Sequence, residues 1–207
     1  MKHSIFLPDA NALVVREEGK VYRAGCQEWF DDKWKRQAGC GPTNCANLLR
    51  YLAVTWEGCE PLCRHDATQK AGFVQLMEDV WPYVTPGNMG VNTTDIFVDG
   101  ARRYGEEKGV PLAARVLNVG PLGGHRDYEA AADFVADALK SRLPVAFLNL
   151  TNGKLKNLHR WHWVTLVALR GDEALMYDYG AVRWINLRQW LDTSALGGGF
   201  VALEPAL

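Results

Sequence analysis

The run QAGCGPTNCANLLRYL, at residues 37–52, has the pattern of the start of a long helix. Four of its side chains fall on one apolar face at helical spacing: Cys45, Leu48, Leu49 and Leu52. Pro42 suits a first helical turn, because a proline there leaves no N–H group without a partner. The pattern therefore predicts an amphipathic helix that ends near residue 54, with Cys40 at or just before its first residue.

This position gives Cys40 a physical reason to be reactive. The unpaired N–H groups and the positive dipole end at a helix N-terminus favour a thiolate. Gly39 and Gly41 flank the cysteine, and we expect them to leave the backbone open to a substrate carbonyl. A lone cysteine in a tight turn is more often a packing residue. The hypothesis of a nucleophile therefore depends on the rest of the chain.

Other local patterns organise the first two-thirds of the chain. Residues 1–39 are expected to be irregular or short-stranded, with FDDKWKR (30–36) as a charged loop. A second helix is predicted from Asp66, which forms a capping-box pattern with Gln69, and it ends before Pro82. Two more helices are predicted: from about 92–93 to Gly109, and over 128–141 with Asp127 as its cap.

The period then changes from helix to strand. Five strands are predicted: PVAFLNL (144–150), HWVTLVAL (162–169), EALMYDY (173–179), VRWINL (182–187) and GFVALEP (199–205). Residues 113–119 are a candidate sixth strand. Short turns such as RGDE between consecutive strands favour antiparallel pairing. The predicted fold class is therefore α+β, with N-terminal helices packed on a C-terminal antiparallel sheet.

Bulk composition narrows the function classes. The 207 residues, 48% of them hydrophobic, are enough for one domain (1–207) with a sizeable core. A net charge of −1 argues against nucleic acid or an anionic membrane as partner. We expect no membrane span and no signal peptide, because no apolar run is long enough. Five cysteines are an odd number, so a reduced, cytoplasmic protein is expected.

A cysteine nucleophile needs a base and a group that orients the base. His162 opens an apolar strand between Trp161 and Trp163, where neighbours hold it at the edge of a cleft. Asp178 ends the next predicted strand, and its carboxylate can accept the other imidazole N–H. Alone, each residue is more often structural. With Cys40 they predict a Cys–His–Asp triad.

This triad makes a demand on the sheet. Side chains alternate faces along a strand. A regular two-residue hairpin at Gly171–Asp172 would pair even residues with odd ones, which would point Asp178 away from His162. We therefore predict a three-residue turn or a β-bulge, which would set Asp178 opposite Val164 and diagonal to His162.

Three motifs together, GCGPTNCANLL, HWVTLVAL and MYDYG, resemble the papain-like cysteine peptidases. They are most similar to the branch of the bacteriocin leader-processing peptidases. The segment MGVNTTDIFVDGARRYGEEKG also resembles the helix that these proteins place between Cys and His. The resemblance implies a papain-like fold, with Cys40 as nucleophile, His162 as general base and acid, and Asp178 as orienter. A double-glycine leader substrate does not follow from it.

The family also implies a glutamine that donates to the oxyanion, about six residues before the cysteine. Trp34 stands at that position here. Gln37 is close to Cys40 in sequence, whereas Gln27 would reach the site if FDDKWKR loops out. We take Gln27 as the oxyanion candidate. If neither glutamine serves, the backbone N–H of Cys40 remains as a donor.

Several residues compete with these assignments. His159 is an alternative base, and His125 is expected in a loop. Cys59, Cys63 and His65 have a C-x3-C-x-H spacing but no evident fourth zinc ligand.

The predicted function is a cysteine peptidase or amidase that acts on a peptide or a small amide or acyl substrate, without metal or cofactor. Four tryptophans are candidates for the cleft wall: Trp29, Trp34, Trp161 and Trp163. An acyltransferase with an amine acceptor, an inactive peptide-binding module and a small zinc protein remain alternatives.

Overall fold

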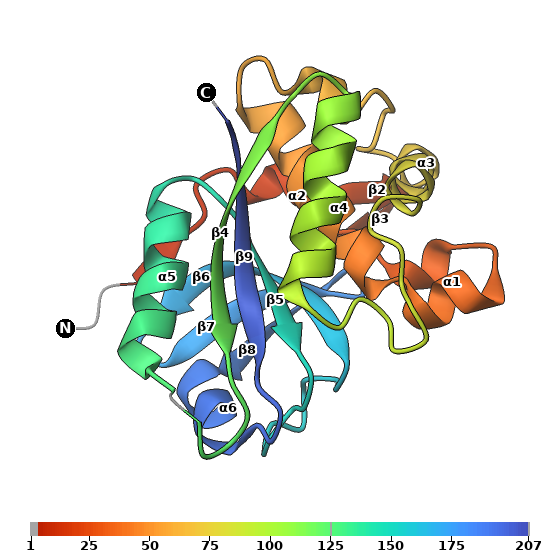
Figure 1. Cartoon of the computed structure of the whole chain (residues 1–207). Helices are drawn as coiled ribbons and strands as arrows, with labels where there is room; N and C mark the ends of the chain where they lie inside the picture. Colours follow the sequence, from red (N-terminus) through yellow and green to blue (C-terminus); the bar gives the residue numbers. More distant parts are fainter. Residues whose placement is uncertain (1–3, 125, 207) are drawn as a thin grey trace.

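The long helix begins at the cysteine. A computed structural model describes residues 4–124 and 126–206, and in it helix α2 spans Cys40–Thr55 with Gly39 as its N-cap (Figure 1). Pro42 lies in its first turn, as predicted. The four side chains of the apolar face are all buried: Cys45, Leu48, Leu49 and Leu52. Burial of this face fixes α2 as a central helix of the core.

The described residues contain six α-helices: α1 (Lys33–Ala38), α2, α3 (Lys70–Val80), α4 (Thr94–Glu107), α5 (Tyr128–Lys140) and α6 (Leu187–Thr193). The predicted cap of α5 is confirmed, because the Asp127 side chain accepts from Ala130 N. Helix α4 starts close to the predicted position, and the Thr93 side chain caps it by accepting from Ile96 N. The sequence patterns had not predicted α6.

Two predictions about local structure are wrong. FDDKWKR is not a loop, because helix α1 begins at Lys33 and the Asp32 side chain caps it by accepting from Lys35 N. Helix α3 begins at Lys70 and not at Asp66. The Asp66 carboxylate accepts instead from the backbone and hydroxyl of Thr68, which closes a local turn before the helix starts.

The strands form a large antiparallel sheet and a separate hairpin. The described strands are β1 (Ser4–Phe6), β2 (Val15–Glu17), β3 (Lys20–Tyr22), β4 (Leu112–Val119), β5 (Val145–Asn149), β6 (His162–Arg170), β7 (Glu173–Asp178), β8 (Ala181–Asn186) and β9 (Gly198–Pro205). The order in the seven-stranded sheet is β4-β9-β5-β6-β7-β8, with β1 also paired to β6. β2 pairs with β3. The predicted mixed architecture with an antiparallel sheet is confirmed.

Helices cover both faces of this sheet. Phe147 of β5 and Phe200 of β9 are cross-strand partners with stacked rings, and Phe134 of α5 packs against Phe200. Trp163 of β6 points to the other face, where its ring stacks on Phe97 of α4. In Figure 1, β4 and β9 run between α5 and α4. The main core therefore has two apolar layers, one on each side of the sheet.

No helix in the described part of the chain has the length and apolar character to cross a lipid bilayer. All five cysteines are free thiols.

Candidate active site

The start of α2 meets the start of β6. Cys40 is almost fully buried, and its Sγ lies 3.9 Å from the carbonyl oxygen of Trp161, the residue just before β6. Gly39 caps the helix without a side-chain hydrogen bond, so the N–H groups of the first turn are not capped by a side chain. The thiol therefore lies at a helix N-terminus and beside the segment that carries His162.

The flanking glycines have a different role from the one we expected. A Cβ on Gly41 would lie 2.6 Å from a methyl carbon of Val91, and one on Gly39 would lie 2.3 Å from the Lys35 carbonyl oxygen. These spaces are therefore filled by neighbouring groups and are not open to a substrate carbonyl. The two glycines allow α1 and the 91 segment to pack closely around Cys40.

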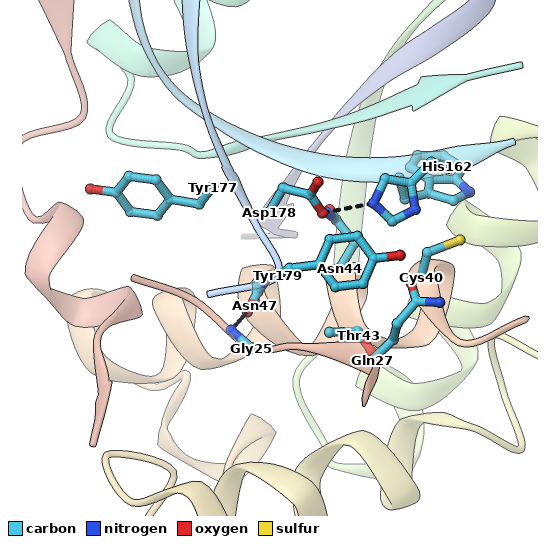
Figure 2. Close-up of a pocket in the computed structure, with 11 residues that line it drawn as sticks. Gly25, Gln27, Cys40, Thr43, Asn44, Asn47, His162, Tyr177, Asp178 and Tyr179 are labelled. Atoms are coloured by element: carbon cyan, nitrogen blue, oxygen red, sulfur yellow. Dashed lines mark hydrogen bonds and ion pairs between the residues drawn. The ribbon is translucent and has the colours of Figure 1, made fainter. Parts of the chain in front are cut away.

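His162 and Asp178 form a buried hydrogen-bonded pair. Nε2 of His162 lies 2.7 Å from Oδ1 of Asp178, and both side chains are about 95% buried from solvent, with 6% and 5% exposure. Figure 2 shows this pair above Cys40, with the ring between the carboxylate and the thiol. Burial alone lowers the pKa of His162, but the hydrogen bonds with Asp178 and Cys40 raise it, and the net pKa is above its usual value.

A β-bulge brings the two residues onto the same face. The hairpin closes with a two-residue turn, since Arg170 pairs with Glu173. The register then shifts between Leu166 and Ala168, and Thr165 pairs with Tyr177. Continued by one residue, this register sets Asp178 opposite Val164. The predicted bulge is therefore confirmed, at Val167, and the alternative of a three-residue turn is wrong.

Two residues that the sequence did not single out complete the environment of the pair. The Tyr179 ring stacks on His162 at a centroid distance of 5.3 Å and an interplanar angle of 12°. Arg183 Nη1 lies 3.6 Å from Oδ2 of Asp178. The tyrosine shields the imidazole from solvent, and the arginine offsets the charge of the buried carboxylate.

Gln27 lies in the site. It lines the same small cavity as Cys40, of about 20 Å³, together with His162 and Asp178 (Figure 2). The Gln27 Nε2 atom donates to the Arg36 carbonyl oxygen at 2.6 Å, which leaves its second amide hydrogen for another acceptor. Gln37 is exposed. It lines two larger, open pockets, of about 400 and 460 Å³, and is not among the residues that line the small cavity. Helix α1, and not an open loop, returns the chain from Gln27 to Cys40.

A buried polar cluster ties these segments together. The side-chain amides of Asn44 and Asn47, both on α2, donate to the Thr165 hydroxyl oxygen of β6 at 3.1 Å. The Asn47 Oδ1 atom accepts from Gly25 N at 2.9 Å. The cluster therefore connects the helix of Cys40, the strand of His162 and the loop that leads to Gln27. We had not predicted it, because the sequence does not show which buried amides meet across the fold.

The other histidine candidates occupy different places. His159 is exposed, and its ring makes edge contacts at 5.8 Å with both His162 and Tyr179. The imidazole that is hydrogen-bonded to Asp178 is that of His162 and not of His159. His125 lies outside the described residues.

The C-x3-C-x-H segment does not assemble as a metal site. The His65 ring is paired with Asp79 at 2.8 Å, and the Cys63 thiol lies 3.5 Å from the His65 carbonyl oxygen. Within the described residues, no group of three or more His, Cys, Asp or Glu side chains is arranged to hold a metal ion.

The tryptophan candidates divide between pocket and core. Trp34 and Trp161 line a pocket that opens beside Cys40. Trp163 is buried and stacks on Phe97, although it also lines the small cavity. Trp29 is partly buried and packs edge-on against Tyr22 and Phe73, at the border of the hydrophobic core.

No protein-family model matches this chain, and no curated protein matches it significantly.

Proposed function

We propose that this protein is a thiol-dependent hydrolase of papain-like type, a cysteine peptidase or amidase. The observation that carries the proposal is the placement of Cys40, at the N-terminus of a long helix, beside an imidazole that is hydrogen-bonded to a buried carboxylate. A thiol, a base and an orienting carboxylate are the three groups that covalent acyl catalysis requires. In the sequence they are far apart.

The raised pKa of His162 supports an ion pair with Cys40. An imidazole whose pKa lies above its usual value stays protonated at neutral pH, and an adjacent imidazolium stabilises a thiolate. The N-terminal dipole of α2 acts in the same direction. In this proposal Cys40 is the thiolate and His162 is the imidazolium before the substrate binds.

The reaction follows from these charges. The Cys40 thiolate attacks the amide carbonyl, and the carbonyl π electrons move to oxygen as the C–S bond forms. The oxyanion accepts from the Cys40 backbone N–H and from the free amide hydrogen of Gln27. His162 gives its proton to the leaving nitrogen, the C–N bond breaks, and an acyl-enzyme remains. His162 then takes a proton from water, which attacks the thioester and releases the acid.

Asp178 acts through His162. Its hydrogen bond to Nε2 at 2.7 Å fixes the ring so that Nδ1 faces the thiol, and its charge stabilises the imidazolium. The stacked Tyr179 ring keeps water away from this bond.

Site-resolved alkylation tests the ion pair without a known substrate. The protein is treated with limiting iodoacetamide between pH 5 and 9, and mass spectrometry follows each of the five cysteines. We expect Cys40 to react fast well below pH 8 and to lose this reactivity in His162→Ala. His65→Ala is the matched control, because His65 also pairs with a carboxylate but lies elsewhere. If Cys40 reacts no faster than Cys63, the catalytic proposal fails and a binding module is the better description.

A further inference from the structure

Exposed apolar side chains gather beside the nucleophile. Trp34 is 46% exposed, Met89 is 59% exposed and Trp161 is 39% exposed. They come from α1, from the loop between α3 and α4, and from the segment just before β6. They line an open pocket of about 400 Å³, together with Gln37, Ala38, Cys40, Asn88 and Gly90. Large apolar side chains exposed together mark a binding surface, and this volume suits a small organic group.

Trp161 is held in an unusual backbone conformation. Its φ angle is +54°, in the left-handed region that bulky residues rarely adopt. The Trp161 backbone N–H donates to the Leu150 carbonyl oxygen at 3.2 Å, and its own carbonyl faces the Cys40 thiol. Such strain persists where the surrounding structure imposes it, and it concentrates at functional sites. Here it leaves a large indole at the mouth of the pocket instead of in the core.

A second pocket, which shares Gln37 with the first, has a different character. This pocket, of about 460 Å³, contains charged and amide side chains, among them Lys33, Arg36 and Glu28, and it is also lined by Tyr179. Because the Tyr179 ring stacks on His162, this polar pocket lies on the imidazole side of the site. Figure 2 shows the Cys40 sulfur pointing away from Tyr179.

The two pockets orient a substrate. The leaving group must receive its proton from His162 and so lies on the imidazole side, toward the polar pocket. The acyl part then extends from the attacked carbonyl in the other direction, toward the residues Trp34, Met89 and Trp161.

We propose that the pocket of Trp34, Met89 and Trp161 binds the acyl side of the substrate, and that the protein selects acyl groups that carry an aromatic or large aliphatic side chain. This inference rests on the proposed function of Cys40 as an acyl-accepting thiolate. It assigns the substrate class that the triad alone leaves open. A narrow acyl group such as acetyl would leave the pocket unused.

Two esters with the same leaving group test this selection. The rate of Cys40 acylation is measured by mass spectrometry in single turnovers with 4-nitrophenyl acetate and with 4-nitrophenyl 3-phenylpropanoate. Each rate is divided by that of the same ester with N-acetylcysteine, which removes intrinsic reactivity. We expect a preference for phenylpropanoyl of about 10-fold or more in the wild type, the range that a hydrophobic pocket supplies.

Variants locate the preference. Trp34→Ala and Met89→Ala should slow acylation by the phenylpropanoyl ester more than acylation by the acetyl ester, and so reduce the ratio of the two rates. Leu122→Ala is the control, because Leu122 is also an exposed apolar residue, at 61%, and is not among the residues that line this pocket. Both variants replace exposed side chains, so we expect them to fold.

The outcomes separate the two proposals. Equal normalised rates in the wild type, or an unchanged ratio in both pocket variants, would overturn the acyl pocket while Cys40 stays a nucleophile. The same holds if neither ester acylates Cys40 but iodoacetamide alkylates it rapidly at neutral pH. If Cys40 reacts slowly with iodoacetamide as well, the proposed function itself has failed.

Discussion

Cys40 and Cys45 lie on the same helix, one and a half turns apart, in opposite surroundings. Cys45 is fully buried among apolar side chains, and burial raises the pKa of its thiol. Cys40 is in the first turn, beside His162 and next to the open pocket of Trp34, Met89 and Trp161. We therefore expect the same side chain to be inert at position 45 and reactive at position 40, according to the charges and donors around it. Four predictions test this difference, from the largest expected effect to the smallest.

Removal of the imidazole should abolish most of the difference. In His162→Ala, Cys40 has no cationic neighbour from the triad, so no imidazolium stabilises its thiolate. A free thiol with a pKa near 8.5 is about 1% ionised at pH 6.5, so we expect alkylation of Cys40 to slow about 100-fold at that pH. The measurement is iodoacetamide modification of each cysteine. An unchanged rate at Cys40 would contradict the ion pair.

Removal of the carboxylate should move the pH profile as well as the rate. The hydrogen bond that His162 donates to Asp178 raises the pKa of His162. The imidazolium therefore persists above pH 6.5, and activity should fall only as the pH rises through this raised pKa. In Asp178→Ala we expect that falling limb at lower pH, and a loss of activity on the order of 100-fold. Asp133→Ala, an exposed carboxylate on α5, is the control. If Asp178→Ala lowered the activity but left the alkaline limb of the pH profile in place, Asp178 would not be the group that sustains the imidazolium of His162.

Changes to the buried cluster of Asn44, Asn47 and Thr165 should have a smaller effect than loss of His162 or Asp178. This smaller effect should appear in both stability and activity. Thr165→Val removes the oxygen that accepts from Asn44 and Asn47, and two buried amides that lose their acceptor cost about 1–3 kcal/mol of unfolding free energy. A small shift of α2 against β6 should also slow Cys40 acylation about 10-fold. Thr165→Ser keeps the hydroxyl and should restore both values. A destabilised Thr165→Val variant with wild-type acylation would reduce the cluster to a packing role.

The smallest effect is expected at the second cysteine. Cys45→Ala leaves a small cavity in the core and should lower the free energy of unfolding by about 1 kcal/mol. The alkylation rate and pH profile of Cys40 should stay unchanged. Urea unfolding and site-resolved alkylation measure the two quantities. If loss of Cys45 altered Cys40 reactivity, the two thiols would not be independent.

Helices and strands were predicted best where the pattern of a single segment, such as its apolar spacing or a proline, was enough to identify them. The start of α2 follows from Pro42 and the apolar spacing after it. The turn or bulge between β6 and β7 was predicted in a different way, from the requirement that His162 and Asp178 share a face, and the structure has the bulge. Helix α1 was missed because KWKRQA is almost entirely polar and buries only Ala38. The start of α3 was misplaced because the Asp66 carboxylate accepts from the Thr68 hydroxyl and does not cap a helix.

The sequence by itself determined the order of the four longer helices and of the strands that follow them, the helix position of Cys40 and the three residues of the candidate triad. These depend on periodicity, capping and strand alternation, which act over a few neighbouring residues. Only the tertiary structure decided that Gln27 and not Gln37 lines the cavity, and that Tyr179 covers His162. It also decided that Trp34, Met89 and Trp161 line one pocket with Cys40. Those contacts join residues far apart in the chain, and packing of the helices on the sheet sets them.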